Sequence, residues 1–299
     1  MKCKTVLPSV PPLIRGLVAL GIALVALSVG LAGATAAELP KGLVLHYSFD
    51  QATPDGAVPD RSGLKNDGRG TAAKWTATGK QGGGLEMTPG SFVAVPATDA
   101  LALKQFTLAV WFKTTKFDGV WRRLFDRRAD QGFALGIGGD LKDVQSRGKA
   151  VFMVNGGAPC LSDNVLADGI WHHVAATYDG ENLRLYVDGL PQKQVVALKG
   201  EPGAAAEELT IGMNRANPTD QEKGQSFEGL IDDVMVFGRA LSADEIKAMV
   251  YAVDPLAGKP KFTKQQVEQR LRQLKYLYEE GLLTDEFYNR KVAECQTNQ

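Results

Sequence analysis

Residues 169–180 read Gly-Ile-Trp-His-His-Val-Ala-Ala-Thr-Tyr-Asp-Gly, and residues 183–189 read Leu-Arg-Leu-Tyr-Val-Asp-Gly. The side chains from Leu183 to Val187 have the period-2 pattern of a β-strand with one buried face. Asp188 and Gly189 readily adopt the positive φ angles of a tight hairpin turn. We therefore predict strands at 171–178 and 183–187, with a turn directly after the second strand.

The same alternation recurs on both sides of this region, most clearly at 106–113. Further candidate strands lie at 43–49, 91–95, 123–126, 133–137, 150–154, 208–212 and 229–237. Short strands without helices between them predict an all-β domain of two packed antiparallel sheets. The capping box from Ser242 to Glu245 predicts one helix, whose apolar stripe is Ile246, Met249 and Val250.

Three motifs in this order resemble the LamG-like jelly-roll domains of the concanavalin A-like lectin/glucanase superfamily. They are the segment 169–189, an opening motif at 45–50 with 60–63, and a closing motif at 227–246. The resemblance covers residues 42–251 and implies a jelly-roll sandwich of two curved sheets. It leaves the function open, because the same sandwich carries lectins, adhesion modules and hydrolases.

The N-terminus has the pattern of an export signal. Lys2, Lys4 and Arg15 precede an apolar run at 16–34, and Ala34-Thr35-Ala36 has the small residues of a cleavage site. We predict a signal peptide at 1–36, followed by the jelly-roll domain at 38–253, in a secreted or periplasmic/cell-envelope protein. The run of 19 residues also leaves an uncleaved membrane anchor open.

Charge and cysteine content narrow the range of partners. Of 34 basic residues, three lie in the first 36 positions, so the remainder carries 31 basic against 34 acidic residues. This balance argues against binding to nucleic acid, and it allows membrane association only through an uncleaved N-terminal segment. Cys160 and Cys295 could form one bridge, but two independent thiols are favoured, and no Cys/His cluster has zinc spacing.

The motifs of the superfamily's enzymes are missing. Glycan hydrolysis needs two carboxyl groups across the scissile bond, and no Glu-x-Asp-x-x-Glu string or lyase motif occurs. Asp232 and Asp233 are expected on opposite sheet faces, as are His172 and His173, which we interpret as structural histidines. We predict no catalytic residues and a non-enzymatic binding module. A hydrolase or lyase with an unrecognised site and a structural envelope spacer are the alternatives.

The expected partner is a glycan or an extracellular or envelope protein. Sugars stack on exposed aromatic faces, so the candidates are Trp75 and Trp121, which lie near loops, and Trp121 is the preferred ligand-binding residue. The basic pairs at 122–123 and 127–128 are interpreted as a solvated strand face, with an acidic glycan partner as the alternative.

The resemblance also implies one structural calcium ion, because several relatives bind one. The positions that match their ligands are Asp50, Asn66 and Asp232, whose oxygen donors suit calcium. The alternative is that these side chains only cap turns.

The C-terminus is a separate segment. A linker at 254–262 precedes a predicted two-helix domain at 263–296, which resembles the SHOCT domain, a largely bacterial family thought to mediate oligomerisation or docking. The residues proposed to support homo-oligomerisation are Leu271, Leu274, Leu277 and Phe287. Packing of the hairpin onto the sandwich is the alternative, because two short helices bury little surface alone.

Overall fold

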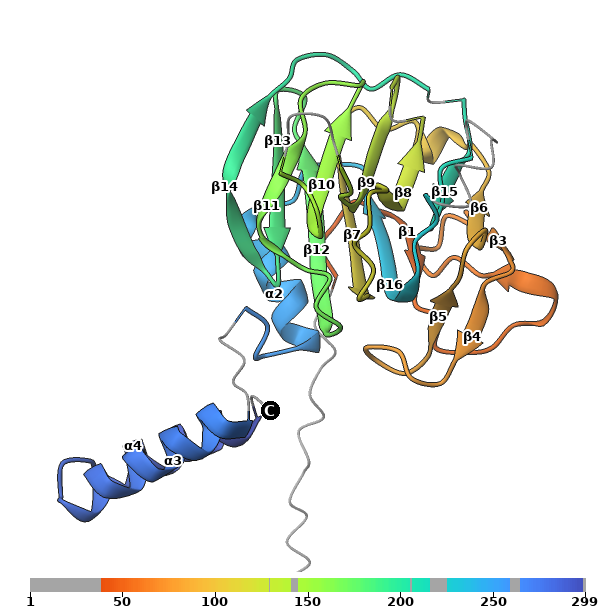
Figure 1. Cartoon of the computed structure of the whole chain (residues 1–299). Helices are drawn as coiled ribbons and strands as arrows, with labels where there is room; N and C mark the ends of the chain where they lie inside the picture. The colour runs from red at the N-terminus through yellow and green to blue at the C-terminus, as the bar shows by residue number, and fades with distance from the viewer. Residues whose placement is uncertain are drawn as a thin grey trace, which may run out of the picture. The chain divides into compact units, whose positions relative to one another are not determined.

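The computed structural model describes residues 39–128, 130–140, 145–204, 206–215, 225–258 and 264–297. This part of the chain contains two antiparallel sheets of eight strands each (Figure 1). The first sheet, sheet A, has the order β14-β13-β12-β7-β16-β5-β4, with β1 also paired to β16. The second, sheet B, has the order β11-β10-β9-β8-β15-β6-β3-β2. The predicted fold class, an all-β jelly-roll sandwich with a C-terminal helical hairpin, is confirmed.

The strands are short and evenly distributed. Sheet A consists of β1 (Leu43–Tyr47), β4 (Lys74–Thr76), β5 (Gly84–Met87), β7 (Phe106–Lys113), β12 (Trp171–Tyr178), β13 (Asn182–Val187), β14 (Leu190–Ala197) and β16 (Gly229–Phe237). Sheet B consists of β2 (Ala57–Val58), β3 (Gly68–Thr71), β6 (Phe92–Val95), β8 (Arg122–Arg127), β9 (Phe133–Ile137), β10 (Lys149–Val154), β11 (Cys160–Val165) and β15 (Leu209–Ile211). The short 3-10 helices η1 (Pro54–Gly56) and η2 (Asp99–Leu101) lie in connections.

Residues 169–189 supply two adjacent strands of sheet A, β12 and β13. Strand β12 pairs with β7 along its full length, from Trp171 opposite Lys113 to Tyr178 opposite Phe106. Its other edge pairs with β13, and β13 ends at a turn where Asp188 has a φ of 50°. Alternate residues of both sheets point inward and form one continuous apolar core between them.

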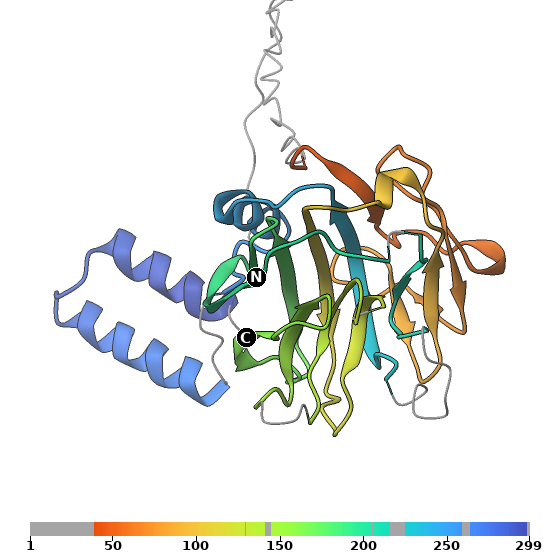
Figure 2. The ribbon, with the colours of Figure 1, turned by 90° about the horizontal axis from the view of Figure 1, so that it is seen from above.

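Helix α2 (Ala243–Val253) covers part of the outer face of sheet A and lies beside β14 in both views (Figures 1 and 2). Its predicted capping box is present, because the Ser242 hydroxyl accepts from the Glu245 amide while the Glu245 carboxylate accepts from the Ser242 amide. Ile246, Met249 and Val250 pack with outward-facing residues of sheet A in a second apolar cluster.

Two further helices, α3 (Lys264–Glu279) and α4 (Asp285–Thr297), form a hairpin. The rings of Tyr278 and Tyr288 stack at 4.4 Å between centroids, and the Tyr278 hydroxyl donates to Asp285 at 2.9 Å. Of the described helices, none is long and apolar enough to cross a membrane. The predicted signal peptide at 1–36 lies outside the described residues.

The two cysteines of the described chain are free thiols, in agreement with the favoured interpretation. Burial raises the pKa of the Cys160 thiol to about 12. The interpretation of the basic pairs as a solvated strand face is wrong, because Arg122, Arg123 and Arg127 are all buried. Arg122 contacts Asp118 and Glu228, and Arg123 pairs with Asp126, whereas Arg127 donates to the Leu101 carbonyl.

Candidate functional site

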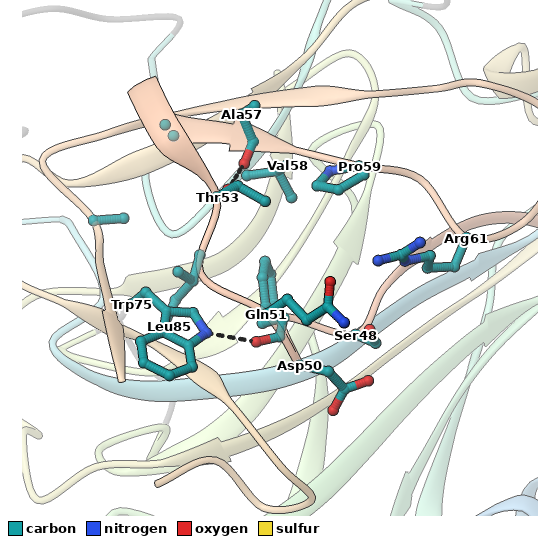
Figure 3. Close-up of a pocket in the computed structure, with 14 residues that line it drawn as sticks. Ser48, Asp50, Gln51, Thr53, Ala57, Val58, Pro59, Arg61, Trp75 and Leu85 are labelled. Atoms are coloured by element: carbon teal, nitrogen blue, oxygen red, sulfur yellow. Dashed lines mark hydrogen bonds between the residues drawn. The ribbon is translucent and has the colours of Figure 1, made fainter. Parts of the chain in front are cut away.

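A cavity of about 120 Å³ opens at the edge of the sandwich. Sheet A contributes the edge strand β4 and its neighbour β5, and sheet B contributes the edge strand β2 and its neighbour β3. The segment after β1 forms the remaining wall (Figure 3). Trp75 lies directly opposite Leu85 in the β4–β5 register, so it points to the same side of sheet A as a core residue. The cavity is therefore the open end of the space between the sheets.

Trp75 forms one wall of this cavity and is held in a fixed position. Its Nε1–H donates to the Phe49 carbonyl at 2.8 Å (Figure 3). Gly83 packs so closely that an added Cβ would lie 2.7 Å from the same ring nitrogen. The side chain is nevertheless 41% exposed. A rigid, partly exposed indole is suited to stacking against the apolar face of a sugar ring.

Besides Ser48 and Thr53, three longer polar side chains line the cavity, namely Asp50, Gln51 and Arg61. All three are exposed, and within the described part of the chain neither charged group forms an ion pair. In Figure 3 the Arg61 guanidinium extends toward the side of the cavity where Gln51 lies. The cavity therefore presents an anion, an amide and a cation beside one aromatic surface.

The backbone around Arg61 is fixed by Asp60. The Asp60 carboxylate accepts from the amides of His46, Ser62 and Asn66 at 2.8–3.0 Å. Although partial burial opposes it, this set of hydrogen bonds holds the pKa of Asp60 below its ordinary value. The Arg61 amide donates to the His46 carbonyl at 2.8 Å. The carboxylate thus attaches the segment that carries Arg61 to strand β1.

A second carboxylate holds the loop at 79–83, which borders the cavity. Asp232 is fully buried, and its Oδ2 accepts from the amides of Lys80 at 2.8 Å and Gln81 at 2.9 Å. Burial raises the pKa of Asp232 to about 7. At the other end of the loop, Gly82 lies against the Asp50 carboxylate.

The structure brings two of the three predicted calcium ligands to one loop. Asp50 and Asp232 contact opposite ends of the turn at 79–82. The Asn66 side chain is engaged elsewhere, because its Nδ2 donates to the Val44 carbonyl and its Oδ1 accepts from the Thr98 hydroxyl, both at 2.7 Å. No group of three or more His, Cys, Asp or Glu side chains with metal-binding geometry occurs among the described residues. Asp50 and Asp232 thus lie against one turn, whereas the Asn66 amide already has two hydrogen-bond partners.

The predicted ligand residue Trp121 lies in a different environment. The Arg123 guanidinium covers its ring at 3.4 Å from the centroid, and its Nε1 is buried without a partner in the described part of the chain. The exposed tryptophan is Trp75, the residue that sequence analysis ranked second. Its position in the middle of a three-residue strand did not reveal this, because exposure depends on where the two sheets end.

The expectation that Asp232 and Asp233 face opposite ways is wrong. A register irregularity follows Asp232, and Asp233 has a φ of 45°. Both carboxylates point away from the core between the sheets. The Asp233 carboxylate lies 3.0 Å from His46 Nε2, and the Asp232 carboxylate accepts from the Lys80 amide. Because Asp232 is fully enclosed, the pair does not present two carboxylates to a substrate.

The two adjacent histidines lie on opposite faces of β12, as expected. His172 lies near Phe112 of the inner core, with its Nδ1 2.9 Å from Asp188 and its Nε2 3.3 Å from Asp168. His173 packs against Trp111 on the outer face at 5.2 Å between centroids. Both are buried, which fits a structural role.

Several solved structures share this sandwich. One is domain 4 of AbnA, a GH43 extracellular arabinanase from Geobacillus stearothermophilus in complex with arabinotriose, with 18% identity, a TM-score of 0.55, and coverage of 70% of this chain and 98% of that chain. Another is the binding domain of botulinum neurotoxin DC in complex with rat synaptotagmin II, with 14% identity, a TM-score of 0.52, and coverage of 71% and 52%.

A third is a structure of botulinum neurotoxin type C, whose cell entry depends on interaction with two ganglioside molecules. It has 14% identity, a TM-score of 0.53, and coverage of 71% of this chain and 51% of that chain. This chain therefore spans about half the length of the two toxin chains. At these identities the likeness shows the fold alone. No curated protein matches the sequence.

A family model described as the Concanavalin A-like lectin/glucanases superfamily matches residues 87–247, more than half of the chain. The cavity residues, from Ser48 to Leu85, all precede the matched segment. The sandwich is thus what the chain shares with the family, and the cavity is built from residues outside the match. The chain belongs to the concanavalin A-like lectin/glucanases superfamily.

Proposed function

We propose that this chain is an exported, non-enzymatic module that binds a glycan in the cavity beside Trp75. The observation that carries the proposal is the fixed, partly exposed indole in one cavity with Asp50, Gln51 and Arg61, whose two charged groups form no ion pair with any described residue. Sugars combine apolar ring faces with hydroxyl groups, and this combination of an aromatic wall and a few polar groups matches both. The structures of similar fold include a toxin binding domain and an arabinanase domain solved with arabinotriose.

The binding mode follows from the side chains. The apolar face of a sugar ring stacks on Trp75, and its hydroxyl groups donate to Asp50 and exchange hydrogen bonds with Gln51. Asp50 is the carboxylate that lines this cavity, and the structure places no second Asp or Glu among its described lining residues. Hydrolysis by two flanking carboxyl groups is therefore unsupported at this site.

An extracellular or envelope protein is the second class of partner, supported by the similar fold of a toxin domain that binds a protein receptor. We further propose that the N-terminal segment directs export, that Asp50 and Asp232 hold one calcium ion, and that the C-terminal hairpin mediates association with a second copy. The export and association proposals are independent of the glycan site, whereas the calcium proposal shares Asp50 with it.

The test is a binding screen of the full chain against a panel of neutral and acidic oligosaccharides, arabinotriose included. Trp75→Ala removes the stacking surface and should abolish binding. Phe117→Ala is the matched control, because Phe117 is an exposed aromatic residue that does not line the cavity. Binding that survives Trp75→Ala would contradict the proposed site, and release of new reducing ends from any polysaccharide would contradict the non-enzymatic assignment.

A further inference from the structure

We infer that the cavity selects the terminal residue of an acidic glycan, with the carboxylate of a uronic acid bound by Arg61. This inference rests on the proposed glycan site and adds the chemical class of its ligand. It starts from the two opposite charges in the cavity, which the structure keeps apart.

Asp50 and Arg61 line the same cavity, but no ion pair within 4 Å joins them or engages either one in the described part of the chain. Their anchors explain why they stay apart. The hydrogen bonds of the Asp60 carboxylate fix the backbone at Arg61. Asp50 lies against Gly82, in the loop that Asp232 holds. Two opposite charges held apart in one cavity can each bind a different group of a single ligand.

The charges also orient the ligand. A guanidinium donates two parallel hydrogen bonds to a carboxylate, which makes Arg61 the residue that binds the carboxylate of a uronic acid. The Asp50 carboxylate repels that group and accepts hydrogen bonds from sugar hydroxyls instead. A uronic acid residue carries a carboxylate on one side of the ring and hydroxyls on the other, and its ring face remains available for Trp75.

The size of the cavity limits how much of the glycan it encloses. Its volume of about 120 Å³ is smaller than the roughly 300–1,000 Å³ of pockets that enclose drug-sized ligands. It therefore takes one sugar residue, and the rest of the chain extends into solvent. The terminal residue fits best, because it is linked to the rest of the glycan on one side only and its hydroxyl groups on the other side are free.

The experiment compares two trisaccharides of the same linkage, trigalacturonate and its neutral counterpart galactotriose, by titration of the full chain. EDTA is present throughout, so that no divalent cation bridges the uronate to Asp50. Trigalacturonate should bind about 10-fold more tightly, as expected for one charge-assisted hydrogen-bonded contact, and its affinity should fall with added salt. Arg61→Gln should lower its affinity to that of galactotriose.

Arg69→Gln is the matched control, because Arg69 is an exposed arginine on β3 that does not line the cavity. If both trisaccharides bind equally and both depend on Trp75, the glycan site stands and the inference of acidic selectivity is overturned. Failure of trigalacturonate to bind, or binding unaffected by Arg61→Gln, also overturns it. Loss of both ligands with Trp75→Ala and of only the acidic preference with Arg61→Gln supports it.

Discussion

His173 is a fully enclosed imidazole whose Nδ1 has no partner in the described part of the chain. Burial lowers its pKa to about 4, although the nearby Asp188 opposes this shift. The neutral ring is thus favoured in the folded state. Its contribution to stability is present above the unfolded-state pKa of about 6.5 and is lost as the pH falls toward 4.

His173→Phe removes the titrating ring and retains an aromatic contact with Trp111. Between pH 7.5 and 4.5 the wild-type free energy of unfolding should fall by roughly 2–3 kcal/mol more than that of the variant. Chemical denaturation at the two pH values measures this difference. An identical loss of stability in both proteins would contradict the assignment.

The calcium proposal also concerns single residues. If Asp50 and Asp232 hold a cation, calcium at 100 times its Kd should stabilise the sandwich by about 2.7 kcal/mol, because it binds only the folded state. EDTA should then lower the melting temperature, and Asp232→Asn should remove the difference. Asp55→Asn is the control, since Asp55 is an exposed carboxylate whose φ of 54° asparagine tolerates. A melting temperature unaffected by calcium would exclude the site.

At the level of elements, helix α2 stabilises the outer face of sheet A. Ile246 is fully buried there, so Ile246→Ala should lower the free energy of unfolding by about 2–5 kcal/mol. Lys247→Ala, on the exposed side of the same helix, should change it by less than about 0.5 kcal/mol. Urea denaturation of the two variants makes the comparison, and equal effects would show that α2 does not pack as described.

The hairpin of α3 and α4 leaves apolar side chains in solvent. Tyr276 is 61% exposed and Leu282 is 67% exposed, whereas Leu274 and Leu277 are half-buried. Replacing Tyr276 and Leu282 together by serine should reduce self-association without unfolding the hairpin, since exposed patches of this kind mark interfaces. Light scattering of the full chain measures the assembly, with Lys275→Ser as control. A wild-type chain that is monomeric at high micromolar concentration would refute self-association.

Strong alternation made part of the fold predictable. The predicted strand at 106–113 has the same bounds as β7, and 171–178 the same bounds as β12. Strands β2 to β5, β11 and β14 were not predicted. Strand β14 is mostly exposed on both faces, and β11 ends in the exposed Asn164 and Val165. The position of β11 and β14 depends on contacts between the two strands, such as the hydrogen bond from the Leu161 amide to the Gln194 side chain.

For the whole molecule, the fold was easier to predict than the site. Three ordered motifs were enough to identify the sandwich, because each is a local pattern of strand and turn. The cavity instead combines the edges of two sheets, and the exposure of Trp75 and the covering of Trp121 arise from contacts between distant segments. The Asp232–Asp233 bulge likewise breaks the alternation on which the sequence argument relied.

The central claim is that a saccharide binds against Trp75. The chain has four tryptophans, so the NMR spectrum of a ¹⁵N-labelled sample shows few indole signals. The signal that disappears in Trp75→Phe belongs to Trp75. With the tightest-binding saccharide of the panel, we predict a saturable shift of the Trp75 indole signal while those of Trp111, Trp121 and Trp171 stay in place. A saturating saccharide that shifts another indole and leaves Trp75 unchanged would contradict the account.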